Sequence, residues 1–444
     1  TADVELLRNM AVCIRETGDW WVERGARFTK MPNDPWWFMW DGVDDHPEQG
    51  ACFTGSAAHL LDFECECAQE AGAEFIFSTS ATALVMENGT CVGVQAQGID
   101  GSRMYLKGTE AVVLAADGMQ RNHKMLEKYC GAGNAIAAAA KGTGYVIRMG
   151  QGVGADMAGY GSWSGNGSFY GGDPTGNLLP LAHVCDYASS MLKMPAWLRF
   201  DKNGKRFTFL NTQKLQDIYN VVGDTSEMYH YLAADEMNRG GSYVVIDSTW
   251  PQRVEQLLND ENSDYIPASA RPNTGSGVID DYHYAGFGWG NLDSESSFAD
   301  CLADGTIKQA DTLEELAVLA GLDPDVLVKT VEDWNVVCEN SEDDPIFNTR
   351  PTWLNPIKEP PFYIAHGNCA LYASQCGLRV SPKQEVLDES GSPIPGLYAA
   401  FFTAGGMADT NQMSKCAMGD QIVCMHGSGL SIAKAILGEP YEMI

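Results

Sequence analysis

Small-residue turns after apolar strands are the parts of this sequence best suited to hold a ligand. The apolar run Ala111–Ala115 leads into Ala116-Asp117-Gly118, and the run Tyr398–Phe402 leads into Gly405-Gly406. A third turn, Gly142-Thr143-Gly144, opens a segment of helical character. Backbone N–H groups can face a ligand at such turns, and the dipole of a following helix favours negative charge there. The turn at Gly405-Gly406, with the helix expected from about Cys416, is therefore the candidate for holding negative charge on a ligand.

Aromatic side chains crowd the loops near residue 40 and the middle third of the chain. Aromatic rings with polar edges suit a bulky ring substrate, and most of them can equally form the core of a loop-rich domain. They are Trp36, Trp37, Trp40, Trp163, Phe169, Tyr170, Tyr187, Trp197, Tyr219, Tyr282, Tyr284, Phe287 and Trp289.

Charge and cysteine content narrow the classes of function. The chain has 29 Lys and Arg residues against 59 Asp and Glu residues, a formal net charge of −30. Such a polyanion repels nucleic acid, whereas an acidic face can dock a basic redox partner. The 13 cysteines have no spacing typical of a disulfide framework or a metal site, so we expect buried or free thiols and assign no metal ligand. A cluster whose ligands converge from distant parts of the chain stays open. No apolar run is long enough to predict a transmembrane helix.

Hydrophobic periodicity predicts the elements that position these residues. The second helix is expected to turn Leu60, Leu61 and Phe63 inward, and Glu87–Thr90 is expected to be a hairpin turn. Helices are expected at residues 3–25, 56–71, from about 142, 313–320, 323–338 and about 416–437, and strands at 73–77, 83–86, 91–97, 104–108, 111–115 and 398–402.

A change of composition near residue 158 predicts two structural units. Gly, Ser, Asn and aromatic residues dominate after that point, and a Pro-rich stretch at 342–361 is typical of an extended linker. We predict an α/β domain formed by residues 1–157 and 371–444, interrupted by a second, α+β unit at residues 158–370.

Four ordered segments resemble the flavoprotein family of fumarate reductase and succinate dehydrogenase, whose scaffold the 3-ketosteroid dehydrogenases share. The segments follow the order and approximate spacing of that family and cover nearly the whole chain. They are Ala111–Gly118, Arg199–Phe207, Arg350-Pro351 with Pro361–Ala365, and Pro393–Ala400 with Gly405-Gly406.

The resemblance implies a fold, a cofactor and a reaction. The fold is a Rossmann-like, glutathione-reductase-type FAD-binding domain interrupted by a substrate-capping domain. The cofactor is FAD, and the reaction is reduction or desaturation of a C=C bond, with hydride from flavin N5 and a proton from an acid on the protein. The implied cofactor-binding residues are Ala116, Gly118, Gly142, Thr143, Gly144, Phe402, Gly405, Gly406, Ala417 and Met418.

The sequence departs from the family pattern at the cofactor. The first βαβ unit, with its Gly-x-Gly-x-x-Gly turn, is missing from the sequence, and without it the FAD pyrophosphate lacks its usual site. Three explanations stay open: the sequence is a fragment, the unit lies on another chain, or FAD is not bound. Thr143 and Phe402 also replace two carboxylates that the family places near the flavin.

The resemblance assigns candidate catalytic residues by position. The family's acid arginine falls on Lys214, and the arginine and glutamate of its proton relay fall on Lys193 and Ser190. Lysine can donate a proton if burial lowers its pKa, although both can equally be ordinary solvated lysines. Tyr372 or Tyr219 can donate a hydrogen bond to an enone or lactone carbonyl, as tyrosines do in the ketosteroid enzymes.

The family's dicarboxylate clamp is lost. Its histidine-containing segment becomes Tyr372–Gly377, and its second clamp segment becomes Thr410–Ser414, with neither histidine nor arginine in either. Because pairing with arginine is the main source of affinity for a small dianion, fumarate and succinate are not the expected substrates.

The sequence therefore predicts an FAD-dependent oxidoreductase acting on a C=C bond conjugated to a carbonyl in a bulky, largely apolar substrate such as a steroid. Two alternatives remain: a catalytically degenerate paralogue or subunit, and a reductase of a small unsaturated acid. Electrons are expected from a separate donor, a cytochrome or a flavin reductase, because no Cys-x-x-Cys-His haem motif is present. A cytoplasmic and an exported location are both compatible with the sequence.

Overall fold

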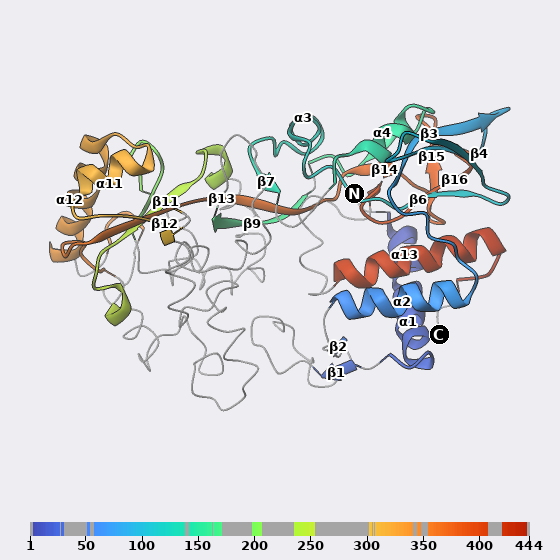
Figure 1. Ribbon diagram of the computed structural model, residues 1–444, viewed down its shortest axis with the longest axis horizontal. Helices are drawn as coiled ribbons and strands as arrows, with labels where there is room; N and C mark the ends of the chain where they lie inside the picture. Colours follow the sequence, from blue (N-terminus) through green and yellow to red (C-terminus); the bar gives the residue numbers. More distant parts are fainter. Residues whose placement is uncertain are drawn as a thin grey trace.

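A computed structural model describes most of the chain and shows two groups of elements joined by one long strand (Figure 1). The described residues are 3–26, 28–30, 51–53, 57–137, 142–161, 163–170, 198–206, 235–253, 302–303, 305, 307–340, 344–347, 354–406 and 420–441. The first group contains the N-terminal and C-terminal helices, and the second contains the helical pair predicted near residue 320.

Three helices form a layer on one side of the first group: α1 (Val4–Glu23), α2 (Ala57–Glu70) and α13 (Asp420–Leu437). Asp3 caps α1 by accepting the backbone N–H groups of Glu5 and Leu6, which are otherwise unsatisfied at a helix start. The predicted helices at 3–25 and 56–71 are thereby confirmed. The expectation that Leu61 turns inward is wrong, because its side chain is 60% exposed.

One carboxylate connects all three helices. Glu64 Oε1 on α2 accepts the indole N–H of Trp21 on α1 at 2.8 Å and lies 2.8 Å from Nδ1 of His426 on α13. The rings of Trp21 and His426 meet edge to face at 4.9 Å between centroids. The helix layer is therefore held by a polar junction as well as by apolar packing.

The hairpin predicted around residue 88 is confirmed. Strands β3 (Thr79–Glu87), β4 (Thr90–Gly98) and β5 (Arg103–Lys107) form an antiparallel sheet in that order. The β3–β4 turn places Asn88 and Gly89 at φ of 50° and 84°, the positive values that asparagine and glycine tolerate best in two-residue hairpins.

A second sheet contains the parallel pair that matters for the site. Strand β6 (Val112–Leu114) runs parallel to β16 (Pro393–Ala399), which pairs antiparallel with β15 (Glu385–Leu387). Val112 and Leu114 are buried, whereas Val113 is 42% exposed. Among the described strands, β6 has β16 as its one neighbour.

The expectation of a strand at residues 73–77 is wrong for the described structure. The segment forms no regular secondary structure, and no described strand hydrogen-bonds to it. Phe75, Ile76 and Phe77 are 40%, 48% and 78% exposed, and the two phenyl rings stack at 5.9 Å. The residue pattern has strand character, but a strand needs a hydrogen-bonded neighbour.

The remaining elements of the first group are short. They are α3 (His123–Met125) with a π-helical turn at Leu126–Cys130, α4 (Tyr145–Gln151), and the three-stranded sheet of β8 (Met157–Ala158), β14 (Gly377–Arg379) and β17 (Ala404–Gly405). Two further short strands, β1 (Phe28–Lys30) and β2 (Ala51–Phe53), pair with each other. The helix predicted from residue 142 is confirmed, beginning at Tyr145.

Strand β13 (Phe362–Ser374) runs from one group of elements to the other (Figure 1). Its first half pairs with β11 (Ser242–Ile246) and β12 (Ile307–Ala310), and its second half pairs with β7 (Ile136–Ala137) and β9 (Trp163–Tyr170). The ladder with β9 shifts register between Asn368 and Ala370 and again between Leu371 and Ala373. Strand β10 (Leu198–Phe200) completes the sheet beside β11.

The second group has its own core, in which α11 (Leu313–Ala320) and α12 (Pro324–Asn340) cover the β10–β13 sheet. Both helices were predicted from the sequence. Arg206 forms an ion pair with the fully buried Asp344, and its guanidinium carbon lies 4.7 Å from the Trp334 ring centre. This cation–π contact fixes the chain beside α12.

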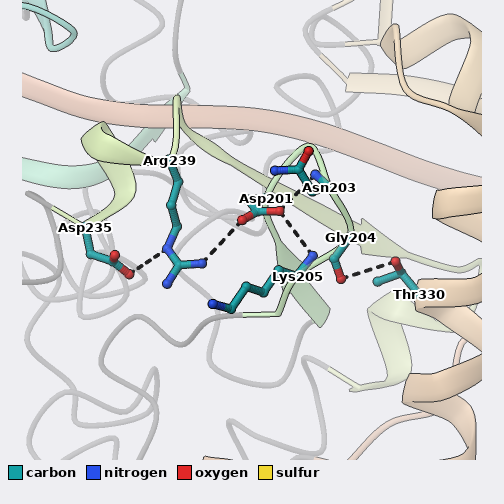
Figure 2. A network of polar contacts seen from close by, with 7 residues as sticks. All are labelled: Asp201, Asn203, Gly204, Lys205, Asp235, Arg239 and Thr330. Atoms are coloured by element: carbon teal, nitrogen blue, oxygen red, sulfur yellow. Dashed lines mark hydrogen bonds and ion pairs between the residues drawn. The ribbon is translucent and has the colours of Figure 1, made fainter.

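Asp201, directly after β10, is the centre of a polar network (Figure 2). Its Oδ1 accepts the N–H groups of Asn203 and Lys205, at 2.8 Å and 3.1 Å, and its Oδ2 lies 3.3 Å from Arg239 Nη1. Arg239 Nε also donates to Asp235, at 2.8 Å. The network fixes the Lys202–Lys205 turn, which belongs to the segment Arg199–Phe207 singled out in the sequence.

Candidate functional site

The carboxyl ends of the parallel strands β6 and β16 meet at one edge. The backbone N–H of Ala400 donates to the Leu114 carbonyl at 2.9 Å, and the Thr403 hydroxyl donates to the Ala116 carbonyl at 2.5 Å. Parallel sheets place ligands outside the carboxyl ends of their strands. The segments 115–118 and 400–406, which are far apart in sequence, are thus neighbours where a ligand is expected.

The Gly142–Gly144 turn packs directly on the turn after β6. Gly144 N–H donates to the Gly118 carbonyl at 2.9 Å, and Arg121 N–H donates to the Gly142 carbonyl at 2.8 Å. A Cβ atom on Gly142 would lie 2.4 Å from the Gly118 oxygen. The structure therefore brings together Ala116, Gly118, Gly142, Thr143 and Gly144, five of the predicted cofactor-binding residues.

The end of β13 contacts this pair of turns through Ser374. The Ser374 hydroxyl is fully buried and accepts the Met119 N–H at 2.9 Å. A Cβ atom on Gly118 would lie 2.2 Å from that hydroxyl oxygen. Glycine at position 118 thus allows the close approach of the Ser374 hydroxyl to the turn.

Gly405 lies in β17 and Gly406 directly after it, so both follow Thr403 in the chain. Gly405 packs so closely on β8 that a Cβ atom there would lie 2.3 Å from the Ala158 carbonyl oxygen. Gly406 has φ of +87°, a conformation that favours glycine. The ring of Phe402 packs against that of Phe401, at 4.3 Å between centroids. It also packs against the hydrophobic core of the first group, which includes Leu378 and Leu397. An aromatic side chain therefore stands where the resemblance implies a carboxylate.

The other predicted site residues fall mostly outside the described residues. Tyr372 belongs to β13, where its neighbour Leu371 pairs with Ala137 and Gly165. No described contact tests its side chain. Lys214, Lys193, Tyr219, Ala417 and Met418 lie outside the described residues, and so do Ser190 and most of the aromatic residues named above. Their roles stay predictions.

Three polar residues at this edge were not singled out from the sequence as site residues: Asp117, Ser374 and Thr403. The carboxylate of Asp117 accepts the N–H groups of Gly118 and Gly142, at 2.8 Å and 3.1 Å. The available signal was a polar residue directly after an apolar strand, which marks the edge where strand ends converge.

Two buried thiols lie behind the site. The hydrogen bond between Cys376 and Cys130, together with burial, raises the pKa of Cys376 far above its ordinary value. Protonated, buried thiols are poor nucleophiles and poor metal ligands. In the ranges that the structure describes, no group of three or more His, Cys, Asp or Glu side chains is placed to hold a metal ion.

The residues at this edge fit part of a flavin nucleotide site. Ala115, Ala116 and Thr143 are exposed beside the half-buried Asp117, so small side chains leave the backbone of the turn open to a ligand. The donors and acceptors there are peptide groups and one carboxylate, without any metal-ligand set. Such a surface can accept the polar edge of an organic cofactor.

The comparisons assign the chain to a class of flavoprotein. Residues 9–416 match the family model described as FAD binding domain, so the chain belongs to that family, and its cofactor is FAD. A solved open conformation of a flavocytochrome c3 fumarate reductase superposes with a TM-score of 0.61 at 17% identity, covering 98% of this chain and 65% of that one. The chain thus has the FAD-binding fold of fumarate reductases.

Two curated relatives indicate the range of chemistry in the family. NADH:acrylate oxidoreductase of Vibrio harveyi is 25% identical over 424 residues, covering 94% of this chain and 35% of the relative. A 3-oxosteroid 1-dehydrogenase of Mycolicibacterium smegmatis is 25% identical over 352 residues, covering 75% of this chain and 54% of the relative. The chain therefore spans about a third to a half of the length of these relatives. Within the described residues, no helix is long and apolar enough to cross a membrane.

Proposed function

We propose that this chain is the FAD-binding part of an oxidoreductase that reduces or desaturates a C=C bond conjugated to a carbonyl, in a bulky and largely apolar substrate such as a steroid. Membership of the FAD-binding family and the similarity to an acrylate reductase and a 3-oxosteroid dehydrogenase support the reaction class.

One observation carries the choice of an uncharged substrate. In the segment Tyr372–Gly377, which aligns with the dicarboxylate clamp, the Ser374 hydroxyl is fully buried and holds the Met119 N–H. Gln375 is also buried, with 6% exposure. The segment therefore supports the cofactor turn and brings no cation toward a substrate. At this segment a small dianion would lack the charge-assisted hydrogen bonds that bind it.

The bound flavin supplies hydride at N5. The residues of this chain hold the cofactor edge, exclude water and deliver a proton to the carbon next to the hydride acceptor. Lys214 is the proposed proton donor, with Lys193 behind it, and Tyr372 and Tyr219 are the proposed donors to the substrate carbonyl. A positioned acid and a hydrogen-bond donor are what an enolate-like transition state requires.

The domain organisation is part of the same proposal. Residues 1–157 and 371–444 form the Rossmann-like flavin domain without its first βαβ unit, and residues 158–370 form the capping domain. The exposed side chain of Val113 supports a further covering element beside β6, because parallel strands are normally covered on both faces.

Electrons come from a separate donor in this proposal, a cytochrome or a flavin reductase. The net charge of −30 favours a donor with a basic docking face. The runner-up functions are a reductase of a small unsaturated acid, which the acrylate reductase similarity favours, and a degenerate subunit, which Thr143 and Phe402 at two carboxylate positions favour.

The deciding experiment is an absorption spectrum of the purified full-length protein, followed by anaerobic reduction and re-oxidation. Flavin bands near about 375 and about 450 nm are expected, and a steroid-like enone should re-oxidise the reduced flavin. Re-oxidation by acrylate or fumarate alone would replace the bulky substrate with a small acid. A colourless protein that takes up no added FAD would leave the degenerate subunit.

A further inference from the structure

The carboxylate of Asp117 accepts hydrogen bonds from both of the turns that we expect to face the cofactor. Asp117 Oδ1 accepts the Gly118 N–H at 2.8 Å and the Gln120 side-chain amide at 3.1 Å, while Oδ2 accepts the Gly142 N–H at 3.1 Å. Converging backbone N–H groups at glycine turns are the usual donors to a bound phosphate. Here two such donors, the N–H groups of Gly118 and Gly142, are already hydrogen-bonded to the Asp117 carboxylate.

The residues around the carboxylate are largely exposed. Asp117 is half-buried, and it is flanked by the exposed residues Ala115, Ala116 and Thr143. Ser374 and Thr403 fix the turn from the opposite side through Met119 N–H and the Ala116 carbonyl. The position of the carboxylate is therefore set by the surrounding backbone, with both of its oxygens engaged by N–H groups of the two turns.

We propose that Asp117 determines which part of the cofactor this turn accepts: a hydroxyl-bearing, uncharged stretch of the flavin nucleotide and not its diphosphate. A phosphate here would meet a carboxylate and would find the Gly118 and Gly142 N–H groups already engaged. A sugar hydroxyl brings no charge and can donate to carboxylate or carbonyl oxygens. The inference rests on the proposed function for its cofactor and deepens that function by assigning a specificity role to this residue.

The test uses inorganic phosphate as the probe and needs no bound flavin. The backbone amide signals of Gly118 and Gly142 are followed by NMR in the isotope-labelled, flavin-free full-length protein during phosphate titration. The wild type should show no saturable shift at these two amides. Asp117→Ala and Asp117→Asn should show one, with half-saturation at a phosphate concentration at least about tenfold below the highest that leaves the wild type unshifted.

Asp388→Asn is the matched control. Asp388 Oδ1 accepts the backbone N–H groups of Ser390 and Ser392, at 2.9 Å each, in the β15–β16 hairpin. Its loss removes the same charge and the same type of cap, and should leave the Gly118 and Gly142 signals unchanged in phosphate.

A second readout compares ligands. Asp117→Asn should weaken riboflavin binding, because the ribityl hydroxyls lose a charged acceptor, and should not weaken ADP binding. Phosphate binding at Gly118 and Gly142 in the wild type, or unchanged phosphate and riboflavin affinities in both Asp117 variants, would overturn the proposal. A protein that binds no flavin at all would refute the proposed function, and the phosphate titration would still decide the role of Asp117.

Discussion

The Thr403 hydroxyl donates to the Ala116 carbonyl at 2.5 Å, joining residues that lie 287 positions apart in the sequence. Thr403 is fully buried, whereas Ala116 belongs to the exposed part of the turn. The bond fixes the end of β6 against the segment that follows β16. The geometry of the predicted cofactor edge thus depends on a side chain that does not itself face the ligand.

Replacing Thr403 by valine tests this connection. Valine keeps the shape and removes the hydroxyl, so we expect a loss of about 1 kcal/mol in the free energy of unfolding, the usual net value of one hydrogen bond. FAD affinity should fall as well, because the turn at Ala116 loses its tie. Urea denaturation and FAD titration measure the two effects. Thr403→Ser keeps the hydroxyl and should retain most of both, so equal losses in the two variants would contradict the role of the hydrogen bond.

Gly142→Ala tests the close packing of the two glycine turns. The new Cβ would lie 2.4 Å from the Gly118 carbonyl oxygen, a backbone atom that cannot rotate away. We expect a destabilisation of about 2 kcal/mol, typical of overpacking, together with loss of FAD binding. The control is Gly429→Ala in α13, where a Cβ meets nothing within 4 Å. That change should stabilise the protein by about 0.5 kcal/mol or more, because alanine favours a helix interior.

Glu64→Gln tests the junction of the three helices. Glutamine keeps the size of the side chain but weakens the contacts with Trp21 and His426. The free energy of unfolding should therefore fall by about 1–2 kcal/mol, the value for a hydrogen bond to a charged group. Glu66→Gln, on the exposed side of the same helix, should change stability by less than about 0.5 kcal/mol. Thermal or urea unfolding compares the pair. Equal midpoints for both variants would show that the junction contributes nothing.

His366 makes stability depend on pH in a defined direction. Burial lowers its pKa below the ordinary value, against an opposing hydrogen bond to the Gly240 backbone, and its ring packs on Tyr243 at 4.6 Å. Because the unfolded chain then takes up the proton first, the free energy of unfolding should decline as the pH falls below about 6.5. His366→Gln should decline less between about pH 7.5 and about pH 5.5 in urea denaturation. A variant that declines as steeply as the wild type would contradict this assignment.

The elements that the sequence predicted best are those with local signals. The β3–β4 hairpin depends on Asn88 and Gly89, whose positive φ values the turn requires. Helix α12 begins at Pro324, the residue type favoured in a first helical turn. The segment 73–77 was predicted wrongly, because its apolar pattern cannot reveal that no described strand pairs with it.

Site residues, too, could be predicted where the signal was local in the sequence. The glycine turns near residues 118 and 142 could be found because they follow an apolar strand and open a helical segment. Ser374 and Thr403 could not be assigned roles, because their partners are backbone groups that only the fold brings near. The same holds for the contact of Asp117 with the Gly142 N–H, 25 positions away. The buried Ser374 hydroxyl, for example, meets Met119 across 255 positions of sequence.

The register shifts in β13 have a mechanical consequence. Strand β13 is hydrogen-bonded to β11 and β12 at one end and to β7 and β9 at the other, so the two groups of elements cannot slide past each other without breaking its ladders. The irregular register between Asn368 and Ala373 bends and twists the strand at that stretch. Strand β13 is therefore a continuous tie between the two groups, and its change of direction falls immediately before Ser374, which holds the cofactor turn through Met119.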